Sequence, residues 1–305
     1  MTFQLKILGS NSAAPAHNRH QSAQLLQIEN QFILIDCGEG TQMQLKKYRG
    51  KARRINHIFI SHLHGDHYLG LVGLLSTMHL QGRKQDLDLY GPAPLAEIIT
   101  MHLRHSEMYL SYKVHFHPLK LDGMEVIMET PALEVLGFPL SHRITCHGFL
   151  FREKPKPFRI NKSVMPKDMK LQHIIMLKKG EDVYDEEGNL LYHAQEMTFP
   201  PRRSRSYAYC SDTIYDPNLH NWVQGVDLLY HESTFLKEHE NRASDTYHST
   251  AEQAAMVARD ARAGQLLLGH FSIRYKDLSP ILQEAKSVFP ASKLATEGEI
   301  ITVED

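Results

Sequence analysis

The stretch Ser61-His-Leu-His-Gly-Asp-His67 places three histidines and one aspartate within seven residues. It follows the apolar run Ile58-Phe-Ile60, which predicts a buried strand that ends where the polar residues begin. A single histidine near a strand end is usually satisfied by hydrogen bonds, but a cluster this dense favours metal binding. Its nitrogen and oxygen donors suit zinc, and manganese is the second candidate.

The spacing within this stretch lets four side chains converge. His62 and His64 are two residues apart, so a strand-like backbone projects both to the same side. Gly65 permits the turn that follows, and Asp66 and His67 lie on that turn. A pair of metal ions held by such groups could hydrolyse a phosphodiester. The two ions would clamp the attacking and leaving oxygens, and a metal-bound water would supply hydroxide near neutral pH.

Apolar runs that end in a group capable of chemistry occur at five other places along the chain. These groups are Asp36, His142, Asp212, His231 and His270. Near-continuous apolar strands are buried on both faces in layered α/β folds, where ligands collect outside the strand ends. We therefore expect these side chains to lie on one rim and to build one site.

Two helices are expected between these strands. Residues 69–80 have apolar side chains at helical spacing, with Asp66 or His67 as a cap at the start. Residues 251–263 follow a capping-box pattern made by Thr250 and Gln253, and Gly264 stands where a C-terminal glycine belongs. Because no glycine-rich phosphate loop is present, the pattern favours an αββα sandwich over a Rossmann fold.

Composition fits a soluble globular protein. The 305 residues are 42% hydrophobic and 23% charged, which predicts one large domain or one domain with an insertion. The three cysteines, Cys37, Cys146 and Cys210, are expected to be buried and reduced, which favours the cytoplasm. We find neither a signal-peptide pattern nor the roughly 20 apolar residues of a membrane span, so no membrane association is expected.

Charge is distributed unevenly although the net charge is only −1. Residues 152–179 contain nine basic residues against two acidic ones, a net of +7. On composition alone this segment is a solvated surface insertion. Beside a phosphodiesterase site it becomes a candidate docking arm for a polyanion.

The histidine motif is similar to the HxHxDH signature of the metallo-β-lactamase superfamily. Five local matches that span nearly the whole chain further resemble the ribonuclease Z family, the short-form tRNA 3′-processing endonucleases. They are Leu8-Gly-Ser-Asn-Ser12, Asp36-Cys-Gly-Glu-Gly-Thr-Gln42, Ser61–His67, His231-Glu-Ser-Thr234, and His248-Ser-Thr250 with Gly269-His-Phe-Ser-Ile-Arg-Tyr275. The resemblance implies a metallo-β-lactamase αββα sandwich over residues 1–305 that carries a flexible arm at residues 152–198.

The same resemblance implies two Zn²⁺ ions per subunit, with Mn²⁺ as the alternative, and seven ligands. The first ion would take His62, His64, His142 and Asp212. The second ion would take Asp66, His67, Asp212 and His270. Asp212 would therefore bridge the two.

Catalytic roles are implied in the same way. Asp36 resembles the carboxylate that orients a metal-ligating imidazole, and Asp66 resembles the group that positions or deprotonates the attacking water. His248, with Glu232 and His231 nearby, resembles the proton source for the departing ribose 3′-oxygen. The implied reaction removes the 3′ trailer from a tRNA precursor by metal-hydroxide attack and leaves a 3′-hydroxyl on the tRNA.

The family's arm grips tRNA far from the metals, usually from a second subunit, so tRNA precursors and a homodimer are the implied partners. Pro201-Arg-Arg-Ser-Arg-Ser206, just after the arm, resembles the PxKxRN loop that senses the tRNA end. The usual Gly-Pro element of the arm is absent from residues 167–176. The residues expected to contact tRNA are Lys154, Lys156, Arg159, Lys162, Lys167, Lys170, Lys178, Lys179, Arg202, Arg203 and Arg205.

Two other functions are compatible with the motifs. The first is a metallo-hydrolase of the same fold that acts on a small phosphodiester or sulfate ester, because the metals alone do not select the substrate. The second is a catalytically silent member that only binds nucleic acid or protein. The complete ligand set together with His248 argues against the silent form, since binding alone needs no acid beside a dinuclear centre.

Overall fold

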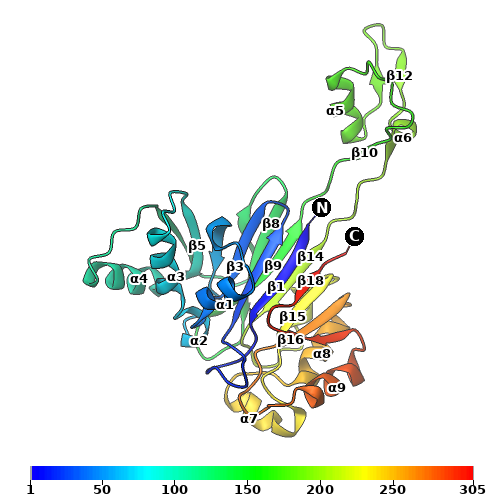
Figure 1. Cartoon of the computed structure of the whole chain (residues 1–305). Coiled ribbons are helices and arrows are strands. Elements are labelled where there is room, and N and C mark those ends of the chain that lie inside the picture. The colour runs from blue at the N-terminus through cyan, green and yellow to red at the C-terminus, as the bar shows by residue number, and fades with distance from the viewer. Residues whose placement is uncertain (1, 305) are drawn as a thin grey trace.

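The apolar runs form two seven-stranded mixed sheets that pack face to face in the computed structural model, which describes residues 2–304 (Figure 1). The first sheet has the strand order β18 (Ile300–Thr302), β1 (Phe3–Gly9), β2 (Ala23–Ile28), β3 (Gln31–Ile35), β4 (Ile55–Phe59), β5 (Leu87–Pro92) and β6 (Val114–Leu119). The second has the order β17 (Ser292–Leu294), β16 (Gln265–Gly269), β15 (Leu228–Glu232), β14 (Ser206–Cys210), β9 (Cys146–Glu153), β8 (Leu133–Leu140) and β7 (Glu125–Glu129).

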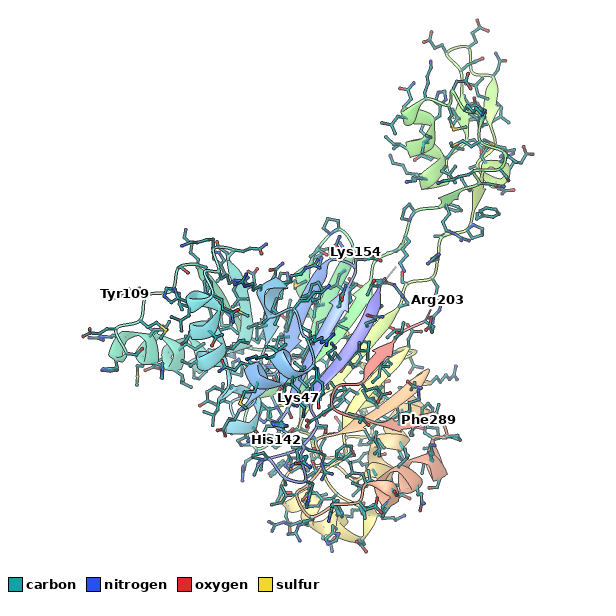
Figure 2. The ribbon with its side chains drawn as sticks, viewed as in Figure 1. Lys47, Tyr109, His142, Lys154, Arg203 and Phe289 are labelled. Atoms are coloured by element: carbon teal, nitrogen blue, oxygen red, sulfur yellow. The ribbon has the colours of Figure 1, made fainter. Side chains whose placement is uncertain are left out.

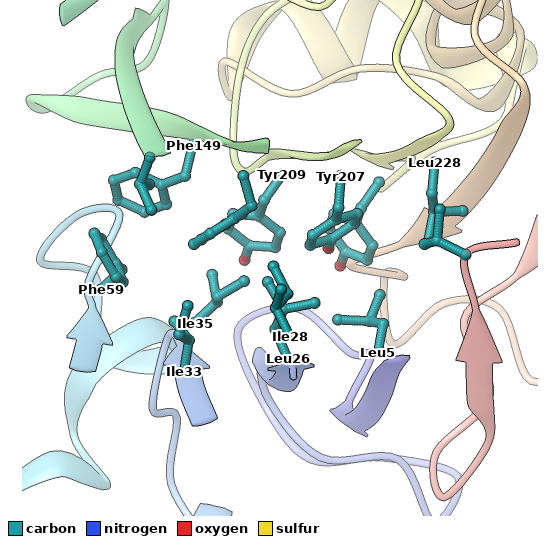
Figure 3. Packing of buried hydrophobic residues seen from close by; sticks show 14 of the residues in the cluster. Leu5, Leu26, Ile28, Ile33, Ile35, Phe59, Phe149, Tyr207, Tyr209 and Leu228 are labelled. Carbon is teal, nitrogen blue, oxygen red and sulfur yellow. The ribbon is translucent and has the colours of Figure 1, made fainter. Parts of the chain in front are cut away.

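Alternate residues of the two sheets meet in a buried core. Leu5, Ile33 and Ile35 from the first sheet face Phe149 and Tyr209 from the second (Figure 3). Phe59 lies in the same layer, where its ring stacks on Tyr90 with centroids 4.4 Å apart. Each fully buried apolar side chain of this size stabilises the fold by roughly 1.5–3 kcal/mol, so the sandwich holds its strand ends rigidly.

Helices cover the two outer faces, which completes the αββα sandwich expected from the sequence. Over the first sheet lie α1 (Thr41–Lys47), the short 3₁₀ helix η1 (Ala52–Arg54), α2 (Gly65–Tyr68), α3 (Leu71–Leu80) and α4 (Pro94–His105). Over the second lie η2 (Leu219–Asn221), α8 (Ala251–Asp260) and α9 (Ser279–Val288). The short helices η3 (Lys237–His239) and α7 (Glu240–Asp245) lie between β15 and α8 in the chain.

Two details of the predicted helices are wrong. Asp66 and His67 cap nothing, because both lie inside α2, which precedes α3. The capping box of Thr250 and Gln253 is confirmed, but α8 ends at Asp260. Gly264 does not cap it; an added Cβ there would lie 2.7 Å from the Asp227 carbonyl oxygen, so the glycine permits a close approach to that backbone.

Strand direction brings the polar strand ends to one rim. β3 and β4 run parallel to each other, as do β14, β15 and β16. β8 is antiparallel to β9, and β9 is antiparallel to β14, so β8 points the same way as β14. The residues that follow these strands therefore emerge on the same side of the sandwich.

An inserted module projects from the opposite end. Between β9 and β14 the chain leaves the sandwich and folds into a small unit at the upper right of Figure 1. Its core contains Leu177, Val183, Ala194 and Met197. Its elements are β10 (Arg159–Ile160), α5 (Leu171–Lys179), β11 (Val183–Tyr184), β12 (Leu190–Tyr192), α6 (Ala194–Met197) and β13 (Thr198–Phe199).

The three cysteines are free and buried, as the sequence analysis expects. Among residues 2–304, no helix has both the length and the apolar character needed to cross a bilayer.

Candidate metal centre

Seven histidine and aspartate side chains converge at the rim. His62 and His64 lie on the loop after β4, Asp66 and His67 lie in α2, and the other three follow their strands: His142 after β8, Asp212 after β14 and His270 after β16. They form two four-residue groups that share Asp212, and within each group the potential ligand atoms lie within 4.8 Å of one another. Buried histidine and aspartate groups arranged in this way are typical of a binuclear metal site.

In the first group, three imidazoles surround one point. His64 Nδ1 lies 3.1 Å from His62 Nε2 and 3.1 Å from His142 Nε2. Asp212 Oδ2 lies 3.6 Å from His62 Nε2. Burial lowers the pKa of His62, so this ring is neutral and keeps a lone pair available for a cation.

In the second group, the other oxygen of Asp212 is central. Its Oδ1 lies 3.3 Å from His67 Nε2 and 3.2 Å from His270 Nε2. Asp66 Oδ2 lies 3.3 Å from the same His270 nitrogen. Burial opposes ionisation of Asp212, but His270, His67 and His62 around it hold its pKa well below the usual value.

The residues fit a pair of metal ions. Asp212 Oδ1 is buried and has no hydrogen-bond partner among the described residues, which is costly for a carboxylate unless a cation satisfies it. The donor set is borderline nitrogen and hard oxygen, which suits Zn²⁺. Each group supplies four protein donors, and the rim opens into a cavity from which water can reach them.

Hydrogen bonds from the outer ring nitrogens fix the tautomers. His142 Nδ1 donates to the Tyr247 carbonyl oxygen at 2.8 Å, and His270 Nδ1 donates to Thr234 Oγ1 at 2.9 Å. Both rings therefore turn an unprotonated Nε2 towards the centre. His64 is reversed, because its Nδ1 is the atom that faces His62 and His142.

Asp36 anchors His67 in the same manner. Its carboxylate accepts hydrogen bonds from His67 Nδ1 at 2.7 Å and from Tyr209 Oη at 2.6 Å. It also accepts from the Ser61 backbone N–H at 2.7 Å and from Ser61 Oγ at 2.9 Å. Asp36 itself has φ +54°, a left-handed conformation that is uncommon outside glycine but that aspartate tolerates better than most residues. Together these contacts leave His67 one orientation, with Nε2 facing the centre.

His248 and Glu232 form a charged pair beside the centre. His248 Nδ1 donates to Glu232 Oε1 at 2.9 Å, and the His248 side chain lines the cavity. Burial lowers the pKa of His248, but the Glu232 carboxylate outweighs it and raises that pKa to about 9. Glu232, His248 and His270 also satisfy the spacing of a three-ligand group. The direct bond between His248 and Glu232 instead describes a protonated imidazole held by its counter-ion.

The structure places His231 away from this pair. Side chains alternate along β15, so His231 and Glu232 point to opposite faces of the sheet. His231 is fully buried, its Nδ1 donates to the Glu232 carbonyl oxygen at 2.7 Å, and its Nε2 has no partner among residues 2–304. Its ring makes no hydrogen bond or ion pair to any of the seven converging residues.

The cavity over the centre has a volume of about 530 Å³ and contains residues that the sequence analysis did not single out. Arg143, Arg242 and Arg274 line it and give its mouth a positive charge suited to phosphate. Arg143 directly follows His142, and Arg274 lies within the Gly269–Tyr275 motif, so both carried a positional signal. Arg242 lies on α7 and carried none.

The residues expected to contact tRNA fall into two sets. Six are exposed on the module: Arg159, Lys162, Lys167, Lys170, Lys178 and Lys179. The others lie at its root, where Lys154 bonds Glu129 at 2.5 Å, Lys156 bonds Glu153 at 2.7 Å, and Arg203 pairs with Asp227 (Figure 2). Arg202 is also exposed there.

Arg205 differs from the rest because it is buried. Its side chain is 3% exposed and bonds both carboxylate oxygens of Glu153, at 2.8 and 2.9 Å. Removal of either partner would leave an uncompensated buried charge. Arg205 therefore fastens the root of the module and does not present its guanidinium to an external phosphate.

Two family models match parts of the chain. Residues 3–147 match the family described as "Anti-Pycsar protein Apyc1", and residues 196–271 match the "Beta-lactamase superfamily domain". The second segment contains Asp212, Glu232, His248 and His270.

Comparison with known proteins gives full-length similarity. The chain is 53% identical over 305 residues to the ribonuclease Z of Cytophaga hutchinsonii, a match that covers 100% of this chain and 97% of the relative. It is 43% identical over 302 residues to the ribonuclease Z of Bacteroides fragilis, with 99% of each chain covered.

Solved structures agree with the sandwich. The chain superposes on human tRNase Z, short form, with a TM-score of 0.72 and 27% identity, covering 99% of this chain and 100% of that one. It superposes on a long-form RNase Z from yeast with a TM-score of 0.69 and 16% identity, covering 99% of this chain and 42% of that one. The yeast match supports the fold alone.

Proposed function

The chain belongs to the ribonuclease Z family of the metallo-β-lactamase superfamily, whose members are tRNA 3′-processing endonucleases, and from this membership we propose a two-zinc mechanism. In it, the seven-residue centre holds two Zn²⁺ ions, and the enzyme hydrolyses the phosphodiester between a tRNA and its 3′ trailer. The observation that carries the proposal is the carboxylate of Asp212, whose two oxygens face two separate groups of ligands.

Bound zinc would act as a Lewis acid on the scissile phosphate and would lower the pKa of water to about 7. The protein's part is to hold the ligands so that little reorganisation is needed. The hydrogen bonds of Asp36, Thr234 and the Tyr247 carbonyl lock the orientation of His67, His270 and His142.

Burial opposes ionisation of Asp66, but His67 and His270 hold its pKa well below the usual value, so we propose that Asp66 orients the attacking water by accepting a hydrogen bond from it. Its Oδ2 lies at the rim between His67 and His270, and the side chain lines the cavity. A carboxylate in this position can accept a hydrogen bond from water on the open side of the centre.

His248 is the proposed acid for the departing ribose 3′-oxygen. That oxygen is a poor leaving group, so its departure gains from a proton delivered in the transition state. The pKa of about 9 keeps His248 protonated at neutral pH, and Nδ1 is held by Glu232, which leaves Nε2 as the atom that can donate. We propose no catalytic role for His231.

The exposed basic residues of the arm, which the structure places between the end of β9 at Glu153 and the start of β14 at Ser206, are proposed to bind the precursor tRNA. β9 is eight residues long and runs from the rim to the root of the arm, so the arm leaves the sandwich roughly 25 Å from the centre. From the membership of the family we propose a homodimer in which one subunit's arm serves the other subunit's centre. Sedimentation should then give twice the chain mass of 35.0 kDa.

Metal analysis tests the two-zinc proposal. The wild-type protein, stripped by a chelator and reloaded with zinc, should bind two ions per chain and regain cleavage of a 3′-extended tRNA. Asp212→Ala should lose both ions and activity together, because one carboxylate serves both groups. A variant that kept one tightly bound ion would show that Asp212 does not bridge. Reloading with Mn²⁺ in parallel compares the two metals.

A further inference from the structure

A second positively charged surface lies on the sandwich itself, away from the arm. Between Gly40 and Gly65 the sequence has no acidic residue. The same stretch contains six basic residues on α1, on η1 and on the turn between them, and all six are exposed: Lys46, Lys47, Arg49, Lys51, Arg53 and Arg54. Figure 2 labels Lys47 on this surface.

Four of these cations line one hollow. Lys46, Lys51, Arg53 and Arg54 border a hollow of about 700 Å³ between α1, η1 and α3, and we call these four residues the basic groove. Gln42, Thr77 and Gln81 add polar side chains to its lining, and Met43, Leu45 and Leu74 add apolar ones. Its walls are open to solvent, so an extended ligand could lie along it.

The charge of the basic groove is not neutralised within the described chain. None of the six basic residues is within ion-pair distance of a carboxylate in the described part of the chain. The side chain of Glu297 is 6% exposed, and its oxygens are occupied by His20 and Gln44. Burial lowers the pKa of the neighbouring Lys6, and repulsion from the positive charge of Lys51 lowers it further. Bound phosphates would relieve that repulsion.

The basic groove is connected to the catalytic cavity by two helices. Glu39, just before α1, and Leu69, just before α3, line the cavity, whereas Gln42 and Lys46 of α1 and Thr77 of α3 line the groove. α3 is ten residues long, so the lining of the groove begins within about 15 Å of the lining of the catalytic cavity. A polyanion bound at the centre could therefore continue into the groove.

A second copy of the chain is a poor occupant for the groove. In a two-fold symmetric contact centred on the groove, the same residues of both subunits would meet at the axis, so these cations would face one another. A phosphodiester backbone supplies the opposite charge at regular spacing, and exposed lysines and arginines contact such a backbone with little base specificity.

We propose that the basic groove binds the phosphate backbone of the precursor RNA next to the cleavage site, an inference that rests on the proposed function. It would add affinity and register near the metal centre, independently of the arm. The backbone could come from the acceptor stem of the tRNA or from the 3′ trailer.

The test is a triple variant, Lys46→Gln, Lys51→Gln and Arg53→Gln, compared with a control triple variant, Lys120→Gln, Lys286→Gln and Lys293→Gln. The control residues are exposed cations elsewhere on the sandwich. For the groove variant, KM for a 3′-extended tRNA should rise about tenfold or more while kcat stays unchanged. The salt dependence of log affinity should become shallower by roughly 2–3, because three phosphate contacts are lost. The control and hydrolysis of bis-p-nitrophenyl phosphate should be unaffected.

Substrates with trailers of different length distinguish a backbone from the acceptor stem from a backbone of the trailer. A defect that persists with a one-nucleotide trailer assigns the groove to the acceptor stem, and a defect seen only with a long trailer assigns it to the trailer. An unchanged KM and an unchanged salt slope would overturn the inference. A groove variant whose only change was a lower mass in sedimentation would also overturn it, because the groove would then be a contact between two copies of the chain. If the wild-type protein failed to cut the tRNA at all, the proposed function would fail instead.

Discussion

The histidines at the centre differ in the group that accepts a hydrogen bond from the ring nitrogen facing away from the centre. His67 is bound by a carboxylate, His142 by a backbone carbonyl and His270 by a hydroxyl group. A carboxylate partner makes the imidazole more basic and a stronger ligand, whereas a carbonyl mainly orients it. The centre therefore combines one strongly activated imidazole with others that are chiefly positioned.

His248→Ala tests the proposed acid. The His248 side chain forms a hydrogen bond with Glu232, and it belongs to neither of the two ligand groups that share Asp212. The variant should therefore still bind two zinc ions per chain. Turnover of a 3′-extended tRNA should fall by roughly 10²–10⁴-fold, the usual contribution of a general acid. Metal analysis and single-turnover cleavage measure the two effects separately, and an unchanged rate would remove His248 from the mechanism.

Glu232→Gln tests how the acid is tuned. The Glu232 carboxylate raises the pKa of His248 to about 9, so wild-type turnover should decline only at alkaline pH, as His248 loses its proton. Without that negative charge, the pKa should fall and the decline should move to lower pH by about one unit or more. A pH–rate profile measures the shift. An alkaline limb at the wild-type position would mean that a different group titrates there.

The sequence was informative at residues whose chemistry is rare. All seven residues expected to bind metal meet at the rim, because histidine and aspartate directly after apolar runs are unusual enough to be noticed. His231 was grouped with Glu232 because the two are adjacent in sequence, but alternation along β15 separates their side chains. Arg143, Arg242 and Arg274 were missed because single arginines are common on any surface.

At the scale of elements, strand ends were easier to predict than helix ends. A strand that ends at a buried rim must expose its next residue there, so the positions of His62, Asp212 and His270 follow from the apolar pattern. The start of α3 did not follow, because the motif itself forms the short helix α2. Helix termini depend on local backbone contacts that a sequence pattern does not contain.

Removal of the arm should abolish activity on tRNA but not activity on a small phosphodiester. Arg152 and Ser206 pair across β9 and β14, so residues 155–203 can be replaced by a short turn without disturbing the sandwich. The variant should lose cleavage of a 3′-extended tRNA and keep hydrolysis of bis-p-nitrophenyl phosphate, because the seven converging residues lie at the opposite rim. Both rates are measured together with thermal unfolding. Undiminished cleavage of tRNA would exclude a binding role for the arm.

For the whole molecule, the layered architecture could be predicted from the sequence, but the pairing of strands could not. Buried strands and amphipathic helices indicated an αββα sandwich, yet nothing local in the sequence says that β18, near residue 300, pairs with β1. Such contacts join distant parts of the chain, and they are selected by the packing of the core between the sheets. The basic groove was missed for the same reason, since α1, η1 and α3 enclose it only after folding.

The whole molecule brings together a metal centre, an acid, an arginine-lined cavity and an exposed basic arm, and their combined product is a cut at one phosphodiester. The most direct measurement is to incubate the zinc-loaded enzyme with a 3′-extended tRNA and map both ends of the cut. We predict a 3′-hydroxyl at the discriminator nucleotide and a 5′-phosphate on the trailer, with no cleavage after chelation. A 3′-phosphate, a cyclic phosphate or cuts scattered along the trailer would contradict the account.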